Sequence, residues 1–405
     1  MTTATLEETK RAEPVSKASV TASAAAWLDA LAIARMTLSR KPVVPVLGCV
    51  LIEATDSRVT LTTNNYEASI SVDVADAVSE KMTALLPLGL LVDAIKVTSD
   101  KGSEVTITLL DFLDKQIAVV ASEGFKYPIV MHYSVDEFPR PRAATGPAAF
   151  SIAAAALKSS IKRTAVASSK DRTLPILTSL HFVSDPAESV LRMEATDRYR
   201  LASVCEPAYV NRETNFLLDF ELLLKLSPKI KQKTPVSFVV DDENQTDIGV
   251  KIIFDRFVLH MRCIGGDYPK LQKLFAETYE HSFTVDRAAL VRSATVAQRL
   301  SVRHTPCTFE LLGDRLLLKP SRDGLDVMSA GLLEVPPITI SPRSREGAQF
   351  AVNPTYLLDA VRLIEDDVVT ISFNEVVKPI IFAGAQGAAL DSAFRYLLMP
   401  VRMPS

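Results

Sequence analysis

The segment VNPTYLLDAVRLI, residues 352–364, has a form that occurs twice more in this chain of 405 residues. Its apolar residues recur at intervals of three to four, which is typical of a helix with one buried face. The segments LPLGLLVDAIKV (86–97) and LDFELLLKLSPKI (218–230) share this pattern. With Leu90, Leu222 and Leu357 as corresponding positions, the repeat is about 130 residues long, within the usual size of one domain.

The sequence on either side of these segments also repeats. Alternating and β-branched residues predict strand, turn and strand after each segment, at 104–125, 235–264 and 368–384. A further apolar helix is predicted upstream of each, at 24–39, 151–167 and 286–300. The chain is therefore predicted to be α+β, with three copies of a helix–strands–helix–strands unit. We expect a flexible N-terminal tail over 1–21 and domains over 22–142, 147–277 and 279–405.

Composition places the chain among ordinary globular proteins. It is 48% hydrophobic and 23% charged, with a net charge of −3 from 45 Lys and Arg against 48 Asp and Glu. Tight sequence-specific DNA binders are usually basic, so this balance argues against that class. The polar N-terminus lacks the apolar core of a signal peptide, and no apolar run is long enough to span a bilayer. A cytoplasmic protein is expected.

Charge is sorted by element rather than spread evenly. Basic residues gather on the predicted helices and nearby loops, whereas acidic residues gather in turns such as 240–247 and 364–367. Such a surface attracts phosphates without reading sequence. Few aromatic residues accompany the basic ones, so duplex DNA fits better than a stacked single strand. The alternative, that these side chains only solvate helix faces, stays open for any single residue.

Motifs of enzymes and metal sites are missing from the sequence. It contains no GxxxxGK[ST], GxGxxG after a strand, HExxH or GxSxG. The acidic stretch 240–247 is not in register with a calcium-binding loop, so a hairpin turn is expected there. The four cysteines and five histidines are scattered along the chain and are expected to be reduced thiols and packed or surface side chains. We therefore predict no catalytic residue, no metal and no cofactor.

Two short segments, ATDRYRLA (195–202) and YLLMPVRM (396–403), resemble signatures of the bacterial DNA sliding clamp family, the beta subunit of the replicative DNA polymerase. Further similar segments lie at 41–54, 136–141, 172–182, 265–275 and 353–364, so the resemblance covers roughly residues 22–403. It implies three clamp-type domains per chain and a head-to-tail homodimer that forms a ring of six domains. It also implies a non-catalytic processivity factor that encircles duplex DNA.

The resemblance further implies a groove that binds short peptide motifs of DNA polymerase subunits, the clamp loader and repair proteins. Carried over by position, its wall comprises Leu177, Thr196, Arg198, Tyr199, Arg200, Leu201, Pro269, Lys273, Leu274, Asn353, Tyr356, Pro379, Leu397, Met399, Pro400, Val401, Arg402 and Met403. Apolar Leu, Pro and Met side chains suit apolar peptide anchors, and methionine adapts to different partners. Some family members have Gly-His where this chain has Arg198-Tyr199, which changes the lip of the groove.

The same comparison, together with the charge sorting, predicts residues that contact DNA. They are Arg40, Lys41, Lys158, Lys162, Arg163, Arg172, Lys225, Lys229, Arg292 and Arg299. For the dimer interface it indicates an edge strand that holds Tyr127, Ile129 and Val130, which would meet a helix of the other chain near Val296.

Other interpretations of the sequence remain. The chain could be an enzyme of three fused α+β domains, which the missing motifs oppose. It could be a clamp-like scaffold that keeps only peptide binding, which the basic helices oppose. A specialised second clamp copy that confers resistance to a clamp-binding antibiotic is a further alternative.

Overall fold

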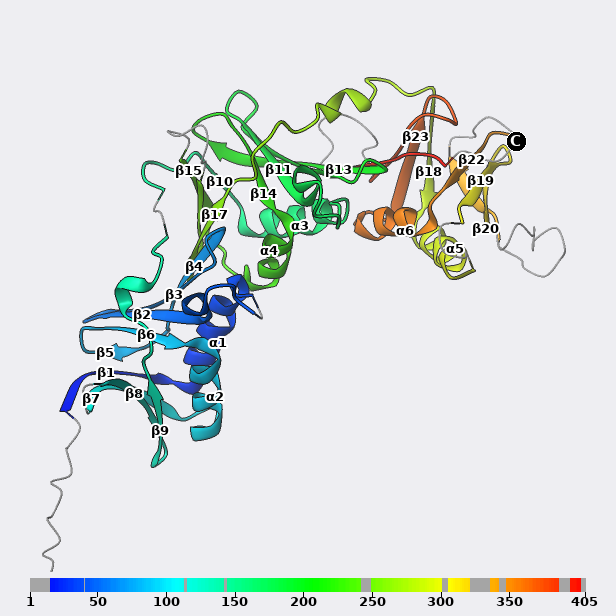
Figure 1. The fold of residues 1–405 in the computed structure, drawn as a ribbon. Helices are drawn as coiled ribbons and strands as arrows, with labels where there is room; N and C mark the ends of the chain where they lie inside the picture. Colours follow the sequence, from blue (N-terminus) through cyan, green and yellow to red (C-terminus); the bar gives the residue numbers. More distant parts are fainter. Residues whose placement is uncertain are drawn as a thin grey trace, which may run out of the picture. The chain divides into compact units, whose positions relative to one another are not determined.

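The computed structural model describes residues 15–39, 41–112, 115–141, 144–241, 249–300, 305–320, 336–341, 347–385 and 394–401. The chain, coloured along its sequence in Figure 1, divides into two compact units. The first unit comprises Met1–Pro147 and Val236–Arg262, and the second comprises Ala148–Pro235 and Cys263–Ser405.

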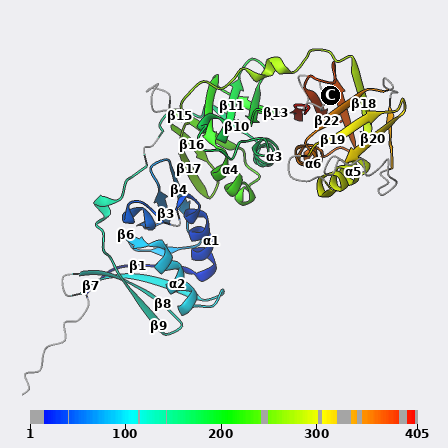
Figure 2. The same ribbon diagram turned by 45° about the vertical axis from the view of Figure 1, so that its right-hand side comes forward.

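The α-helices of the described residues form three pairs, and the two helices of each pair pack against each other (Figures 1 and 2). Side chains of Ser23, Asp219 and Asn353 accept hydrogen bonds from backbone N–H groups at the starts of α1, α4 and α6, which would otherwise lack partners. The pairs are α1 (Ala24–Ala34) with α2 (Leu88–Thr98), α3 (Ala154–Ala165) with α4 (Phe220–Leu226), and α5 (Arg287–Leu300) with α6 (Pro354–Leu363).

Two antiparallel sheets and the pair α1–α2 make up the first unit. One sheet has the order β5-β1-β7-β8-β9, with strands β1 (Val15–Ser23), β5 (Val78–Ser79), β7 (Glu104–Phe112), β8 (Lys115–Ser122) and β9 (Phe125–Val130). The other has the order β6-β2-β3-β4-β17-β16-β15. Its strands are β2 (Cys49–Thr55), β3 (Arg58–Asn64), β4 (Ala68–Asp73), β6 (Met82–Pro87), β15 (Val236–Asp241), β16 (Gly249–Ile253) and β17 (Phe257–Arg262).

A long antiparallel sheet runs through the second unit, in the order β14-β11-β12-β13-β25-β24-β23-β18-β21. Its strands are β11 (Ser179–Asp185), β12 (Val190–Thr196), β13 (Arg200–Val210), β14 (Thr214–Asp219), β18 (His281–Asp286), β21 (Ile338–Ser341), β23 (Val368–Phe373), β24 (Ile380–Ala383) and β25 (Phe394–Leu398). A second sheet, β22-β19-β20-β21, contains β19 (Cys307–Leu311), β20 (Arg315–Pro320) and β22 (Gln349–Val352), and β10 (Phe150–Ile152) pairs with the end of β13.

Apolar faces of the helices build the cores, as the sequence periodicity predicts. In α1 the side chains of Trp27 and Leu31 are fully buried, and in α2 those of Leu91 and Ile95 are. Burying one large apolar side chain contributes about 1.5–3 kcal/mol to stability, so the helix pairs are held mainly by this face. The predicted α+β fold with repeated helix pairs and antiparallel sheets is confirmed.

Each helix begins inside its repeated segment rather than at the first residue of the segment. Leu86, Leu218 and Val352 belong to β6, β14 and β22, and each helix starts two residues later. The polar residues Asp219 and Asn353 explain this boundary at two of the three sites, because each side chain accepts hydrogen bonds from the first N–H groups of the helix.

Over the residues that the structure describes, no helix is both long and apolar enough to cross a membrane. Those residues also contain no cluster of histidine, cysteine, aspartate or glutamate that could hold a metal ion. The turn expected at 240–247 falls largely outside the described residues, although β15 and β16 pair antiparallel on either side of it.

Candidate functional site

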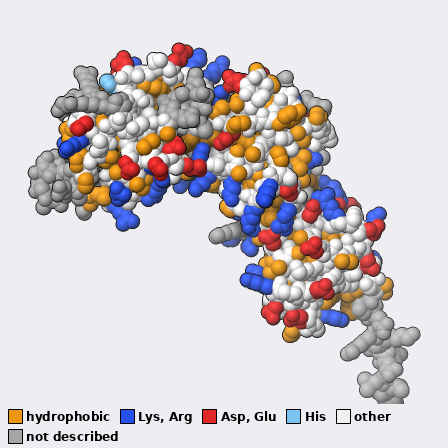
Figure 3. All heavy atoms as spheres, turned by 180° about the vertical axis from the view of Figure 1, so that it is seen from behind, with side chains coloured by type: hydrophobic (Ala, Val, Ile, Leu, Met, Phe, Trp, Pro, Cys, Tyr) orange, Lys and Arg blue, Asp and Glu red, His pale blue; other side chains and the backbone are white. Residues whose placement is uncertain are grey.

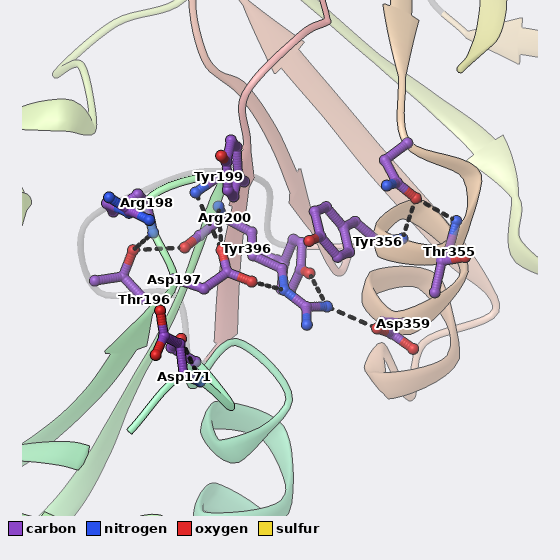
Figure 4. Close-up of polar contacts among 12 residues, drawn as sticks. Asp171, Thr196, Asp197, Arg198, Tyr199, Arg200, Thr355, Tyr356, Asp359 and Tyr396 are labelled. Atoms are coloured by element: carbon purple, nitrogen blue, oxygen red, sulfur yellow. Dashed lines mark hydrogen bonds and ion pairs between the residues drawn. The ribbon is translucent and has the colours of Figure 1, made fainter. Parts of the chain in front are cut away.

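The predicted groove residues of the motif ATDRYRLA form a tight turn between β12 and β13 (Figure 4). The Thr196 hydroxyl accepts from the Arg198 N–H (3.2 Å) and donates to the Arg200 carbonyl (2.7 Å). The Asp197 carboxylate accepts from the N–H groups of Tyr199 (3.0 Å) and Arg200 (3.1 Å). Arg198 adopts φ 79°, a left-handed conformation that side chains other than glycine rarely take. The turn points the exposed Tyr199 side chain outward.

Arg200 is the most constrained side chain of this region. Its guanidinium donates to Asp197 (2.9 Å), Asp359 (2.6 Å) and the Tyr396 hydroxyl (3.2 Å), and only 10% of the side chain is exposed. It also lies 4.1 Å from the centre of the Tyr356 ring, in a cation–π arrangement. Burial lowers the pKa of Arg200, but Tyr396, Asp197 and Asp359 together raise it by more. The pKa of Arg200 therefore lies above its ordinary value.

Helix α6 supplies the opposite side of this cluster. Asn353 accepts from the N–H groups of Thr355 (2.9 Å) and Tyr356 (3.4 Å), and Pro354 occupies the first turn of the helix. Asp359 follows Tyr356 by three residues, so both side chains lie on the face that meets Arg200. The helix cap therefore fixes the two residues that hold the guanidinium.

The chain end completes the region. The Met399 N–H donates to the Tyr199 carbonyl (2.9 Å), and the Val401 N–H donates to the Ala351 carbonyl (2.7 Å). About a third of each of Met399 (36%) and Val401 (39%) is exposed. Backbone pairing thus holds two apolar side chains at the surface beside the turn, as a receptor for an apolar anchor requires.

The remaining predicted groove residues divide by exposure. Leu201 and Leu397 are a cross-strand pair buried under Phe275, so they support the surface rather than form it. Leu177 lies in the short helix Pro175–Thr178, and Lys273 and the 45% exposed Leu274 lie in the short helix Leu271–Leu274. Pro269 is exposed, and Pro379 and Pro400 are half-buried. Arg402 and Met403 lie outside the described residues.

A buried polar network holds the segment between β17 and β18, which carries Pro269, Lys273 and Leu274. Arg395, only 2% exposed, donates to Gln272 (2.9 Å), and Gln272 in turn donates to Glu194. Glu194 also contacts His181, whose ring stacks on Tyr268 at 4.2 Å. Burial raises the pKa of the Tyr268 hydroxyl above its ordinary range. The histidine is a packed side chain, as expected. A cavity of about 1030 Å³ is lined by His181, Glu194, Tyr268 and Gln272, among others.

The predicted DNA contacts on the helices are mostly exposed. Lys158 and Lys162 lie one turn apart on α3, and Arg292 and Arg299 lie two turns apart on α5. Lys and Arg side chains are visible along the side of the second unit that carries these helices (Figure 3). Lys41 and Lys225 are exposed and Lys229 is half-buried, whereas Arg40 lies outside the described residues.

Among the predicted DNA contacts, Arg163 and Arg172 form ion pairs with acidic side chains. Arg163 pairs with Glu365 (2.7 Å), lies 5.6 Å from the Phe394 ring centre, and is only 13% exposed. That arrangement ties α3 to the turn after α6 and leaves little of the guanidinium for phosphate. Arg172 pairs with Glu221 and Asp219 at the surface, where such pairs are weak and can be exchanged.

The predicted interface residues lie on an edge strand and an exposed helix face. β9 is the last strand of its sheet, so one of its edges is available to another chain. Tyr127 and Val130 are half-buried, but Ile129 is 1% exposed and faces the core of its own unit. Val296 on α5 is 37% exposed.

The sequence alone did not identify the residues that hold Arg200. Asp197, Asp359 and Tyr396 were not among the predicted site residues, although all three contact its side chain. Only the i, i+3 spacing of Tyr356 and Asp359 offered a signal, because it places a carboxylate on the same face as a predicted groove residue.

Family models match the chain in two places. The DNA polymerase III beta subunit N-terminal domain matches residues 19–140, and its central domain matches residues 151–270. The Beta sliding clamp of Streptomyces coelicolor is 26% identical over 93% of this chain and 96% of its own. The Beta sliding clamp of Micrococcus luteus is 30% identical over 67% of this chain and 86% of its own. This chain belongs to the beta sliding clamp family.

The fold agrees with that membership. The solved DNA polymerase sliding clamp of Bacillus subtilis has a TM-score of 0.83 to this chain, at 19% identity, over 96% of this chain and 100% of its own. Members of the family are non-catalytic processivity factors of the polymerase holoenzyme, so the chain is not an enzyme.

Proposed function

We propose that this chain is a DNA sliding clamp that encircles duplex DNA and tethers replicative and repair polymerases to it. Two copies join head to tail in a ring, each contributing domains over 22–142, 147–277 and 279–405. The observation that carries the proposal is the match to beta sliding clamps over nearly the whole chain, in sequence and in fold. The ring acts in the cytoplasm.

Exposed basic residues on α3 and α5 support the DNA side of the proposal. They can attract phosphates without contacting bases, so the ring can slide instead of stopping at a sequence. Lys158, Lys162, Arg292 and Arg299 are the strongest candidates, because Arg163 is committed to Glu365. The closed ring, rather than tight binding to phosphates or bases, then keeps the protein on the DNA.

The turn 196–200 and the chain end support the peptide side. A partner's short motif would place an apolar anchor against Met399 and Val401, while Arg200 and Tyr356 form a rigid polar border. The dimer interface would use the free edge of β9 and the α5 face near Val296. The comparisons do not favour the alternative of a specialised, antibiotic-resistant second copy.

Retention on circular and linear DNA tests the proposal. The protein is loaded onto nicked circular DNA with a bacterial clamp loader and ATP, and half of each sample is then linearised. A clamp remains on circles and leaves the linear DNA by sliding off the ends. Equal dissociation from both forms, or failure to load, would contradict topological binding. Mass in solution provides a second check, because the ring must be a dimer of the 44.2 kDa chain.

A further inference from the structure

The first unit contains a turn with the same hydrogen bonds as the turn at 196–200. Asn65 accepts from the N–H groups of Glu67 (3.1 Å) and Ala68 (2.7 Å), as Asp197 accepts from those of Tyr199 and Arg200. Tyr66 takes φ 73°, which matches φ 79° at Arg198. The two turns are therefore copies of one element of the internal repeat.

Strand pairing after the two turns is also equivalent. Ala68 pairs with Met261 between β4 and β17, as Arg200 pairs with Leu398 between β13 and β25. One residue further, Ser69 pairs with His260 where the second unit pairs Leu201 with Leu397. The first unit thus has a polar cross-strand pair where the second unit has an apolar one.

The polar pair borders a cavity in the first unit. In the second unit, Phe275 and Ile381 pack over the leucine pair. In the first unit, Ser69 and His260 instead line a cavity of about 280 Å³.

The Ser69 hydroxyl indicates that this cavity takes a polar ligand. Ser69 is only 2% exposed, and its Oγ has no hydrogen-bond partner among the described residues. An unsatisfied buried hydroxyl costs about 1–3 kcal/mol, so a group that pairs with it gains correspondingly. Most other buried side chains of this part of the chain satisfy their polar atoms, as Ser71 does through Thr62 at 3.0 Å.

Charge around the floor favours an anionic group. Burial, with a smaller contribution from the positive charge of Lys251, lowers the pKa of His260 to about 4, so the imidazole is neutral near pH 7 and can donate one N–H. Arg140 and Arg262 line the cavity from exposed ion pairs with Glu53 (2.8 Å) and Glu67 (4.0 Å), and such surface pairs are weak and can be exchanged for an anionic ligand. Glu67 lies on the exposed rim, where its charge is screened, which leaves Asp241 as the lining carboxylate that opposes an anion.

The size and the apolar part of the lining favour a side chain of a peptide. The volume lies just below the roughly 300–1,000 Å³ of sites for drug-sized ligands. Tyr66 is 60% exposed, and Pro139 and Pro141 also line the cavity, so apolar neighbours of an acidic residue would find contacts there. We infer that the cavity binds the carboxylate side chain of an acidic peptide segment, at a site separate from the turn 196–200.

Histidine NMR on the full chain tests this site. The probe is the blocked peptide Ac-Leu-Glu-Leu-NH2, and the matched control is Ac-Leu-Gln-Leu-NH2. His260 ring signals, assigned with His260→Gln, are expected to shift saturably with the glutamate peptide, which binds about tenfold more tightly than the control. The exposed His132 provides a reference signal that stays in place. Equal affinity for the two peptides, or no shift of His260, overturns the inference.

Matched variants separate the site from the fold. Ser69→Ala is expected to weaken the glutamate peptide about tenfold while leaving the thermal midpoint unchanged or raised, because an unpaired buried hydroxyl is removed. Ser71→Ala, on the same strand, keeps full affinity. Asp241→Asn strengthens binding several-fold, because a like charge is lost. Loss of affinity in Ser71→Ala equal to that in Ser69→Ala, or free succinate binding as tightly as the peptide, refutes a peptide carboxylate site.

Discussion

Replacing Arg200 by methionine tests whether its polar cluster stabilises the second unit. Methionine retains the unbranched apolar stem but removes the guanidinium that contacts Asp197, Asp359 and Tyr396. A broken buried ion pair costs about 3–5 kcal/mol, because a charge is left without a partner. Here Asp197 keeps two backbone hydrogen bonds and Asp359 is 33% exposed to solvent, so neither carboxylate is left without a partner. We therefore expect the lower end, about 3 kcal/mol.

Thermal unfolding followed by circular dichroism measures this cost. For a unit of this size, about 3 kcal/mol corresponds to a fall of roughly 6–12 °C in the midpoint. The buried Trp27, the one tryptophan of the chain, reports on the first unit, so its fluorescence shows whether the units unfold together. Arg362→Met, at an exposed position of α6, is the control and should shift the midpoint little. A shift for Arg200→Met no larger than that of the control would refute the reasoning.

Three further changes probe the turn, the peptide site and the DNA side. Arg198→Gly should raise the midpoint of thermal unfolding by roughly 2–4 °C, because glycine adopts the left-handed φ of 79° without strain. A lower midpoint would mean that the arginine side chain stabilises the protein by more than its backbone strain costs. Met399→Ala with Leu177→Ala should weaken a fluorescent polymerase-tail peptide about 100-fold in a polarisation assay, and loss of the dimer instead would show that these residues hold the ring. Lys158→Glu with Lys162→Glu should shorten retention on nicked circles while the circular dichroism spectrum stays unchanged. The slope of log K for DNA binding against log salt concentration should fall by about 2 in magnitude, and an unchanged slope would place these lysines away from DNA.

Much of the fold could be predicted from the sequence, because it depends on local periodicity. Segments such as 24–39 and 352–364 form helices where their apolar spacing indicates, and the antiparallel strands follow. The contacts of side chains were harder to predict. Arg163 has the spacing of a solvent-facing basic residue, yet it pairs with Glu365, about 200 residues away, through tertiary packing that no local pattern records. The same holds for the buried Arg395, whose hydrogen bond to Gln272 no local pattern records.

The two equivalent turns show how a repeat separates scaffold from function. Asn65 and Asp197 preserve the backbone hydrogen bonds that shape each turn, because either side chain can accept from the same two N–H groups. The side chains that follow the turn differ between the two units. Arg200 forms a rigid polar border in the second unit, where the first unit has Ala68. One residue further, the first unit has the unpaired Ser69 hydroxyl where the second unit has the buried Leu201. The geometry of the turn therefore identifies where a binding surface can form, and the residues just beyond it determine which ligand that surface accepts.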